Sequence, residues 1–195
     1  MKRLSRIQKQ FFDNFRIPEQ NLNGVHGKAV LWVLFQEEEY YQELQHHLET
    51  VGVEIEFESE SLRFDSTDYY EKEMGTELRR IFLSLKGIFP VEESVLFKLE
   101  TTEWEHRWRE SGLRSLNLDP GYLDLHKLVL LSAKEGPQKI YLGQGVWADL
   151  SLLRKSGHFD TLPWTFPDIR DGRYHSFFEK VRDAFKQDLK AARKS

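Results

Sequence analysis

The hydrophobic positions along the chain change their spacing several times, and each change predicts an element. Residues 28–36, KAVLWVLFQ, are almost continuously apolar, which is typical of a central strand buried on both faces. Residues 37–52 follow with a helical spacing. Residues 53–64 then alternate, which places Ile55 and Phe57 on one face and glutamates on the other. The first half therefore predicts a strand, a helix and a half-exposed strand.

The second half of the chain predicts a strand over 77–89 and a helix that Pro90 starts, since proline suits the first helical turn. Three strands then follow one another, expected at 126–134, 139–143 and 145–153. A long loop over 158–173 and an amphipathic helix over 174–194 complete the chain.

The order of these elements predicts an α+β fold. Strand, helix, strand, strand, helix, strand is the order of a ferredoxin-like β-α-β-β-α-β unit, which forms a largely antiparallel sheet. The C-terminal strand meander would extend this sheet, and the helices are expected on one of its faces. A doubly wound parallel sheet is disfavoured because the last three strands have no crossover helices between them. We expect an N-terminal extension over residues 1–27, with an amphipathic helix over 1–16, and a single domain over 28–195.

Length and composition exclude several classes of protein. The chain has 195 residues and no cysteine, which excludes disulfides, thiolate chemistry and cysteine-ligated zinc. No apolar run approaches the roughly 20 residues of a membrane span. The basic start, MKRLSRIQKQFFDNF, lacks the continuous apolar stretch of a secretory signal. We therefore expect a cytoplasmic protein, and its oligomeric state is left open.

Charge is unevenly distributed along the chain. The net charge is −4, but residues 1–27 and 175–195 are each positive by three, so the rest carries −10. A nucleic-acid partner is disfavoured, because phosphate neutralisation requires a basic face. The acidic body suits a metal ion or a cationic group better, although such charge is usually a solvated surface.

The segment GVHGKAV, residues 24–30, has some likeness to a phosphate-binding loop but lacks its spacing. Ala29 stands where a serine or threonine would hold magnesium, and a strand rather than a helix follows. Without a helix N-terminus, the backbone amides that bind phosphates are missing. We interpret the segment as a loop that leads into a strand.

Two loops carry polar residues beyond what a connection requires. Residues 64–78 are long and rich in tyrosine and glutamate for a link between two strands. Asp119-Pro120-Gly121 suits a type II turn, with Asn117 and Asp119 projecting to one side. Each segment is interpreted either as part of a binding site or as local structure, namely a packed loop and a turn.

A third loop and a helix add further candidates. Two prolines stiffen PWTFPD, residues 163–168, so that Trp164 and Phe166 would close over a ligand or cover a sheet edge. In the long helix, Lys98 and Glu105 are seven residues apart and share a face. Such a row is usually solvated, and it joins a site only if that face meets the tyrosine-rich loop.

Five segments together resemble one family of small bacterial proteins. They are TDYYEKEMG, FKLETTEWE, RSLNLDPGYLDLHKLVLLSAK, KIYLGQGVWADL and PWTFPD, in that order within residues 28–180. The family is a domain of unknown function, and some of its members carry the label GTP-binding protein. The resemblance implies no known reaction, and the loop that would hold the phosphates of GTP is missing here.

The family pattern corresponds to particular residues of this chain. The matching positions are Thr67, Tyr69, Tyr70, Glu73, Met74 and Gly75 in the first segment, Lys98, Thr101 and Glu105 in the helix, Arg114, Asn117, Asp119, Pro120, Gly121 and Tyr122 in the third, and Lys134, Trp164, Thr165, Pro167 and Asp168 in the rest. Gln138-Lys139 departs from the pattern, which has a His-Arg pair there. No catalytic role is therefore assigned to Lys139.

The resemblance implies that these polar residues matter, and burial of such groups is costly unless they are paired, so we expect them to converge on one cleft. The catalytic candidates, as acid/base groups or Mg2+ ligands, are Glu73, Glu105 and Asp119. The ligand-binding candidates are Tyr69, Tyr70, Lys98, Arg114, Asn117, Lys134, Trp164 and Asp168. The expected ligand is a small anion, phosphorylated or nucleotide-like. The alternative is a non-catalytic protein-interaction module that uses the basic terminal helices, with these residues in a buried network.

Overall fold

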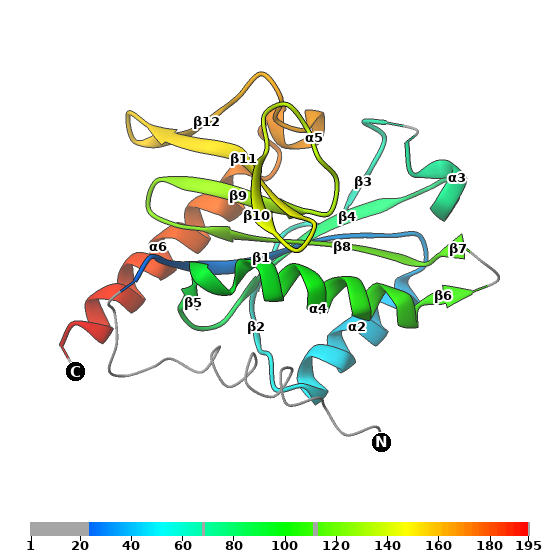
Figure 1. The fold of residues 1–195 in the computed structure, drawn as a ribbon, viewed down its shortest axis with the longest axis horizontal. Helices are drawn as coiled ribbons and strands as arrows, with labels where there is room; N and C mark the ends of the chain where they lie inside the picture. Colours follow the sequence, from blue (N-terminus) through cyan, green and yellow to red (C-terminus); the bar gives the residue numbers. More distant parts are fainter. Residues whose placement is uncertain (1–23, 68, 111–112, 195) are drawn as a thin grey trace.

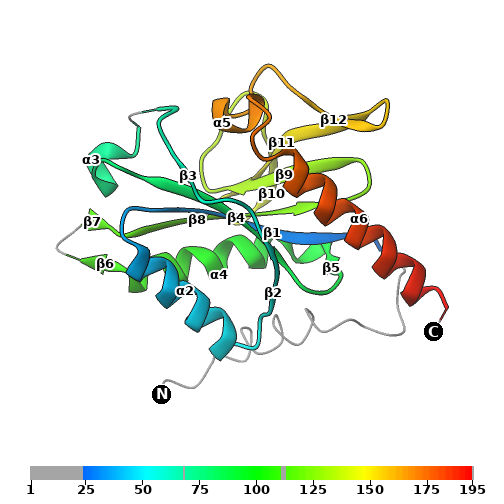
Figure 2. The same ribbon diagram turned by 180° about the vertical axis from the view of Figure 1, so that it is seen from behind.

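The structure, a computed structural model, describes residues 24–67, 69–110 and 113–194 (Figure 1, Figure 2). The helix expected over 1–16 lies outside these residues. The strands are β1 (His26–Phe35), β2 (Ile55–Glu58), β3 (Leu62–Arg63), β4 (Arg79–Leu85), β5 (Phe89–Pro90), β6 (Arg109–Glu110), β7 (Leu113–Arg114), β8 (Leu116–Leu123), β9 (Lys127–Ser132), β10 (Ile140–Gly143), β11 (Val146–Lys155) and β12 (His158–Thr161). The helices are α2 (Glu38–Thr50), α3 (Glu71–Met74), the 3-10 turn η1 (Val91–Glu93), α4 (Ser94–Arg107), α5 (Pro167–Arg170) and α6 (His175–Ala192).

Most of the described strands form one large antiparallel sheet around β1. Its order is β10-β11-β9-β8-β1-β4-β2, and β3, β5 and β12 pair at its margins. The four strands β8-β1-β4-β2 have the ferredoxin-like arrangement, because α2 connects β1 to β2 around β4, and α4 connects β4 to β8 around β1. The predicted α+β class and antiparallel sheet are confirmed. The strand that closes the unit is β8, however, and not the strand predicted over 126–134.

Different elements cover the two faces of the sheet. Leu31 of β1 belongs to the cluster beneath the sheet, which includes Phe97 of α4 and residues of α2. Trp32 belongs to the opposite cluster, which includes Phe178 of α6. Figure 1 shows α2 and α4 beneath the central strands, with α5 and β12 above them. The expectation of helices on one face is therefore wrong for α6, since alternation in β1 leaves both faces apolar.

The alternation predicted for residues 53–64 is interrupted. The register between β2 and β4 shifts between Ile55 and Phe57, as in a β-bulge. Ile55 consequently packs against the lower cluster, whereas Phe57 packs against the upper one. The expectation that both side chains share a face is wrong, because one extra residue reverses the orientation of those that follow.

The turn predicted at Asp119-Pro120-Gly121 is not a turn. All three residues lie inside β8 and pair with Trp32, Leu31 and Val30 of β1. The chain reverses later, where the Asp124 carboxylate accepts hydrogen bonds from the backbone N–H groups of residues 126 and 127 at 2.7 and 2.8 Å. The Asp that caps the turn is therefore the second one in the segment.

Two further boundaries differ from the expectation. The loop predicted over 158–173 contains β12 and the short helix α5. Pro90 ends β5, and α4 begins only at Ser94 after the 3-10 turn. None of the described helices is long and apolar enough to span a membrane.

The segment GVHGKAV leads directly into β1, as interpreted. Its lysine, Lys28, is fully buried and forms ion pairs with Glu56 at 2.6 Å and with Asp188 of α6 at 2.5 Å. This lysine therefore ties α6 and β2 to the central strand and is not available to a phosphate group.

Candidate functional site

The central feature of the site is a gap between two neighbouring strands of the sheet. β8 and β9 pair through Gly121–Leu123 and Leu128–Leu130 only. Toward the start of β8 the strands separate, while the pairing of β8 with β1 continues to Leu116. One edge of β8 is therefore left without a strand partner in this stretch.

Two side chains of α4 take the hydrogen bonds that β9 leaves open. Glu105 accepts a hydrogen bond from the backbone N–H of Leu118, and the Lys98 ammonium donates to the Leu118 carbonyl at 3.2 Å. Because residues alternate along a strand, the nitrogen of Pro120 points to the same unpaired side as Leu118, so its missing N–H costs no ladder hydrogen bond. Lys98 and Glu105, which share a face of α4, are therefore not solvated, as such a row usually is. They are buried, with 5% of Lys98 and 6% of Glu105 exposed.

The same residues belong to a charged network. Lys98 also contacts Asp119 at 3.2 Å, and the second oxygen of Asp119 accepts a hydrogen bond from Asn117 at 2.7 Å. Arg114 contacts Glu105 at 3.7 Å. Arg114 also pairs with the more exposed Glu73 at 2.7 Å. Six candidates from the sequence therefore form two groups of three in direct contact, and Lys98 and Glu105 link the groups through the backbone of Leu118.

The environment displaces the pKa values of the two central carboxyls in opposite directions. Burial raises the pKa of Glu105, and the charge of Lys98 offsets this only in part. Burial acts in the same sense on Asp119, but Lys98 and Asn117 outweigh it and hold the pKa of Asp119 below its usual range. Burial also raises the pKa of the Tyr70 hydroxyl, with a contribution from Asp119. Carboxyl pairs displaced in this way are typical of acid/base sites.

A cavity of about 510 Å³ opens at the gap, and we refer to it as the β8–β9 cavity. Its lining residues are Ser66, Thr67, Tyr69, Tyr70, Lys98, Thr102, Glu105, Arg114, Asn117, Asp119, Leu130, Ser132, Ala133, Lys134, Glu135, Lys139, Phe166 and Pro167. They come from the 64–78 loop, α4, β7, β8, β9 with the loop after it, and the start of α5. Figure 1 shows the 64–78 loop and α5 on the same side of the central strands.

The β9 side of the cavity carries two lysines. The Lys139 ammonium donates to the Ser132 hydroxyl and to the backbone carbonyl of Lys134, both at 3.0 Å. The Lys134 ammonium contacts the Tyr69 hydroxyl and lies 4.2 Å from the centre of the Tyr69 ring. Within the described part of the chain, neither lysine has a carboxylate at ion-pair distance.

Two adjacent tyrosines form the wall that faces these groups. The rings of Tyr69 and Tyr70 meet edge to face, with centroids 5.1 Å apart. Tyr70 is 9% exposed and packs with Leu34 and Met74, whereas Tyr69 is 53% exposed. The loop thus anchors itself through one tyrosine and presents the other.

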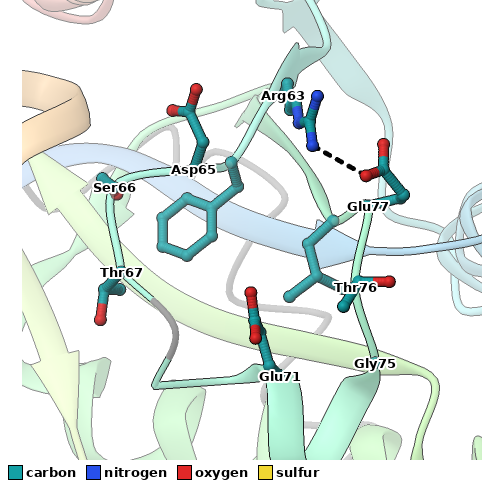
Figure 3. A pocket seen from close by; sticks show the side chains of 10 residues that line it. Arg63, Asp65, Ser66, Thr67, Glu71, Gly75, Thr76 and Glu77 are labelled. Atoms are coloured by element: carbon teal, nitrogen blue, oxygen red, sulfur yellow. Dashed lines mark hydrogen bonds and ion pairs between the residues drawn. The ribbon is translucent and has the colours of Figure 1, made fainter.

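The same loop also lines a smaller hollow of about 340 Å³ (Figure 3). Ser66 and Thr67 line both spaces, so the two are neighbours. Acidic side chains dominate the smaller hollow, and Arg63 pairs there with Glu77 at 2.7 Å. The smaller hollow holds none of the candidates named from the sequence.

Residues 26–185 match the family described as "Domain of unknown function (DUF4416)". The chain belongs to this family. No curated protein and no solved structure matches the chain. Membership in the DUF4416 family brings neither a reaction nor a ligand with it, and nothing in the match supports the GTP-binding label.

Of the catalytic and ligand-binding candidates that the resemblance to the DUF4416 family suggested, all but Trp164 and Asp168 line the β8–β9 cavity or stand beside it. Those that line it are Tyr69, Tyr70, Lys98, Glu105, Arg114, Asn117, Asp119 and Lys134. Glu73 stands beside it through its ion pair with Arg114. Trp164 does not line the cavity, because its indole N–H donates to the Leu150 carbonyl at 2.8 Å on an exposed surface. Its neighbours Phe166 and Pro167 occupy the wall instead.

Asp168 is the second exception, and it leads to a residue that the sequence did not single out. Asp168 is buried and pairs with the buried Arg80 of β4 at 2.8 Å. Arg80 lies 4.3 Å from the centre of the Phe64 ring. Its charge contributes to the lowered pKa of Asp119 and offsets part of the raised pKa of Tyr70. The pair therefore lies behind the cavity. A charged residue at the start of the apolar run RRIFLSL is the signal in the sequence that could have identified Arg80.

The protein already engages the carboxylates of Asp119 and Glu105, whereas Glu135, which also lines the cavity, is exposed. Both oxygens of Asp119 accept hydrogen bonds, and both oxygens of Glu105 contact donors. No group of three or more histidine, aspartate or glutamate residues in the described ranges is placed to hold a metal ion. A Mg2+ ion at Asp119 and Glu105 would face the positive charges of Lys98 and Arg114, which already pair with these carboxylates.

Proposed function

We propose that the β8–β9 cavity binds a small anionic molecule, phosphorylated or nucleotide-like, whose anionic group lies against Lys134 and Lys139. The observation that carries this proposal is the contrast between the two sides of the cavity. Lys98 and Arg114 are neutralised by carboxylates at 2.7 to 3.7 Å. Lys134 and Lys139 are without such partners in the described residues, and an anion would supply one.

The donors on the β9 side suit a phosphate or a carboxylate. Lysine ammonium groups carry three N–H donors and are common partners of phosphate oxygens. The charge of Lys139 acts to lower the pKa of Asp149, but burial outweighs it, and Gln138 donates a hydrogen bond to the Asp149 carboxylate at 3.1 Å. A ligand anion would therefore not have to displace an ion pair at either lysine.

The size and the walls of the cavity support a small organic ligand. A volume of about 510 Å³ lies within the range of roughly 300–1,000 Å³ that is usual for small-molecule sites. Tyr69, Tyr70, Leu130 and Phe166 supply apolar surface for the body of the molecule. An aromatic base or a sugar ring would pack against such side chains.

Chemistry on the ligand would depend on Glu105 and Asp119. A carboxyl with a raised pKa beside one with a lowered pKa can serve as general acid and general base. Glu73, the third catalytic candidate, is more exposed and reaches the cavity only through Arg114. We assign it the role of orienting that arginine.

A thermal-shift screen of the purified protein tests the proposal. The ligands are millimolar ATP, GTP and sugar phosphates, each with and without Mg2+ or Mn2+. A ligand present at 100 times its dissociation constant adds about 2.7 kcal/mol to the free energy of unfolding, which is a shift of several degrees. A shift that requires the metal would assign Mg2+ or Mn2+ to the site.

The matched variants are Lys134→Met with Lys139→Met, and Lys155→Met as the control. Lys155 is an exposed lysine at the end of β11, so its replacement removes one positive charge at a position away from the cavity. The double variant should lose the shift and the control should keep it. A flat screen would favour the interaction module, in which the paired network is structural and basic α6 contacts a partner. A shift that survives in the double variant would overturn the assignment of the anionic group to Lys134 and Lys139.

A further inference from the structure

The two sides of the β8–β9 cavity differ in their hydrogen-bonding character as well as in charge. The pairing of Gly121 with Leu130, continued two residues along each strand, sets Asp119 opposite Ser132 across the gap. Asn117 and Asp119 on β8 present oxygen acceptors. Lys134 and Lys139 on the β9 side present ammonium donors, with the exposed Glu135 beside them, so a ligand in the gap lies between an acceptor wall on β8 and a donor wall formed by the two lysines.

Resting on the proposed function, we infer that the ligand is a hydroxylated phosphate ester, whose phosphate faces Lys134 and Lys139 and whose hydroxyl groups donate to Asp119 and Asn117. The acceptor wall, Asp119 and Asn117, has free lone pairs that can accept hydrogen bonds from these hydroxyl groups. A carboxylate offers about four lone-pair sites, and Asp119 uses two of them for Lys98 and Asn117. The side-chain carbonyl of Asn117 has no donor among the described residues.

Asp119 is also oriented for a ligand. Its side chain is 21% exposed, while its two protein donors hold it from one side. Lys98 itself is held by the Leu118 carbonyl, so the carboxylate is attached to the backbone of its own strand. A fixed acceptor of this kind loses little conformational entropy when a ligand binds.

The charges around Asp119 favour hydroxyl groups over a ligand cation. Lys98 lies 3.2 Å from the carboxylate, and Arg80 is near enough to lower its pKa. A ligand ammonium group at Asp119 would face both positive charges at short range. A neutral O–H donor avoids that repulsion and still fills the free lone pairs. Aspartate makes the same contact with ribose hydroxyls in dinucleotide sites.

Calorimetric titration with three probes tests the inference. The probes are inorganic phosphate, ribose 5-phosphate and ribose. We expect ribose 5-phosphate to bind at least about tenfold more tightly than inorganic phosphate, as two good hydrogen bonds would allow. Ribose alone should give no measurable heat, since it lacks the group that Lys134 and Lys139 bind.

Two variants locate the hydroxyl contacts. Asp119→Asn keeps the shape of the side chain but replaces an acceptor oxygen with a donor, and Asn117→Ala removes the second acceptor. In each, the ratio of the two affinities should fall toward one. The Lys134→Met, Lys139→Met double variant should instead weaken both phosphate probes. The second variant at Asn117 keeps the test valid if Asp119→Asn does not fold.

Each outcome decides something different. Equal binding of the two phosphates by the unaltered protein would overturn the hydroxylated-ester inference and leave the proposed anion site standing. A preference that persists in both β8 variants would overturn the assignment of the hydroxyl contacts to Asp119 and Asn117. The absence of binding by every probe would overturn the anion site and the inference together.

Discussion

Glu105 accepts a hydrogen bond from the backbone N–H of Leu118, although Glu105 belongs to the helix beneath the sheet and Leu118 to a strand within it. The contact occupies a place that the next strand fills in a continuous sheet. Because the side chains of α4 satisfy the open edge of β8, the sheet can part there without leaving buried backbone groups unpaired. The cavity exists for this reason.

Replacement of Glu105 should therefore destabilise the fold itself. In Glu105→Ala, the buried N–H of Leu118 loses its acceptor, and the free energy of unfolding should fall by about 1–3 kcal/mol. Glu105→Gln retains an acceptor oxygen and should lose less. Urea denaturation measures this as a lower midpoint at an unchanged slope. The control is Glu103→Ala, at an exposed position of the same helix. Equal effects at 103 and 105 would contradict the role of this hydrogen bond.

Much of the fold could be predicted because its signals are local. The apolar run at 28–36 and the helical spacings around it identified the central strand and both crossover helices. The ferredoxin-like arrangement followed from their order. The order of the elements did not predict which strand pairs with β1. That β8 lies beside β1, and not the strand predicted over 126–134, depends on contacts between distant segments.

The part of the site that was predicted rests on the family resemblance and not on local patterns. Tyr70, Lys98 and Asp119 are far apart in sequence, and only the resemblance to a family grouped them. Their convergence on one cavity depends on the gap between β8 and β9, which no local pattern encodes. Trp164 failed to join them because a backbone carbonyl offers its indole a partner elsewhere.

Gly121 explains why a turn motif can lie inside a strand. A Cβ atom at this position would lie 2.4 Å from the backbone carbonyl oxygen of Val129 on β9. Glycine is required by this close approach of two backbones, and not by the left-handed conformation of a turn. The proline before it is tolerated because its nitrogen faces the gap.

Gly121→Ala should consequently destabilise the protein strongly, by about 1–3 kcal/mol or more, since neither backbone can yield without disturbing the β8–β9 pairing. Gly136→Ala is the control, because the nearest atom there belongs to the mobile end of the Gln138 side chain at 3.2 Å. Thermal unfolding of the two variants measures the difference. A Gly121→Ala protein as stable as the control would mean that β8 and β9 are farther apart than described.

Breaking the buried ion pair of Arg80 and Asp168 should lower the stability of the protein, as the loss of one partner of an internal ion pair usually does. Arg80→Met leaves Asp168 buried without its cation, and burial already raises the pKa of this carboxyl. We expect a loss of about 3–5 kcal/mol from the free energy of unfolding. Adding Asp168→Leu removes the unpaired charge and should recover a large part of that loss.

A double-mutant cycle over the wild type, the two single variants and the double variant measures the coupling between the two side chains. Additive effects would contradict a direct pair. The same variants test whether the pair supports the cavity wall, because α5 carries Phe166 and Pro167 next to Asp168. Anion binding should weaken in Arg80→Met even under conditions where the variant is fully folded.

His47 should make the stability of the protein depend on pH. Its ring packs edge to face on Trp104 and Trp108, with centroids 5.0 and 5.7 Å away. Burial lowers the pKa of His47 from 6.5 to about 4, and Arg107 and His46 add to the effect. The folded protein therefore keeps this histidine neutral over a range in which the unfolded chain binds a proton.

The stability that the neutral His47 contributes is complete above pH 6.5. It declines as the pH falls toward about 4, by at most about 1.4 kcal/mol per pH unit. His47→Phe keeps a ring against the two tryptophans and removes the titration, so its loss of stability between pH 7 and pH 5 should be smaller than that of the wild type. Chemical denaturation at both pH values gives the comparison. His106→Gln, at an exposed position of α4, should leave the profile unchanged. A pH profile that is the same in His47→Phe as in the wild type would show that another group is responsible.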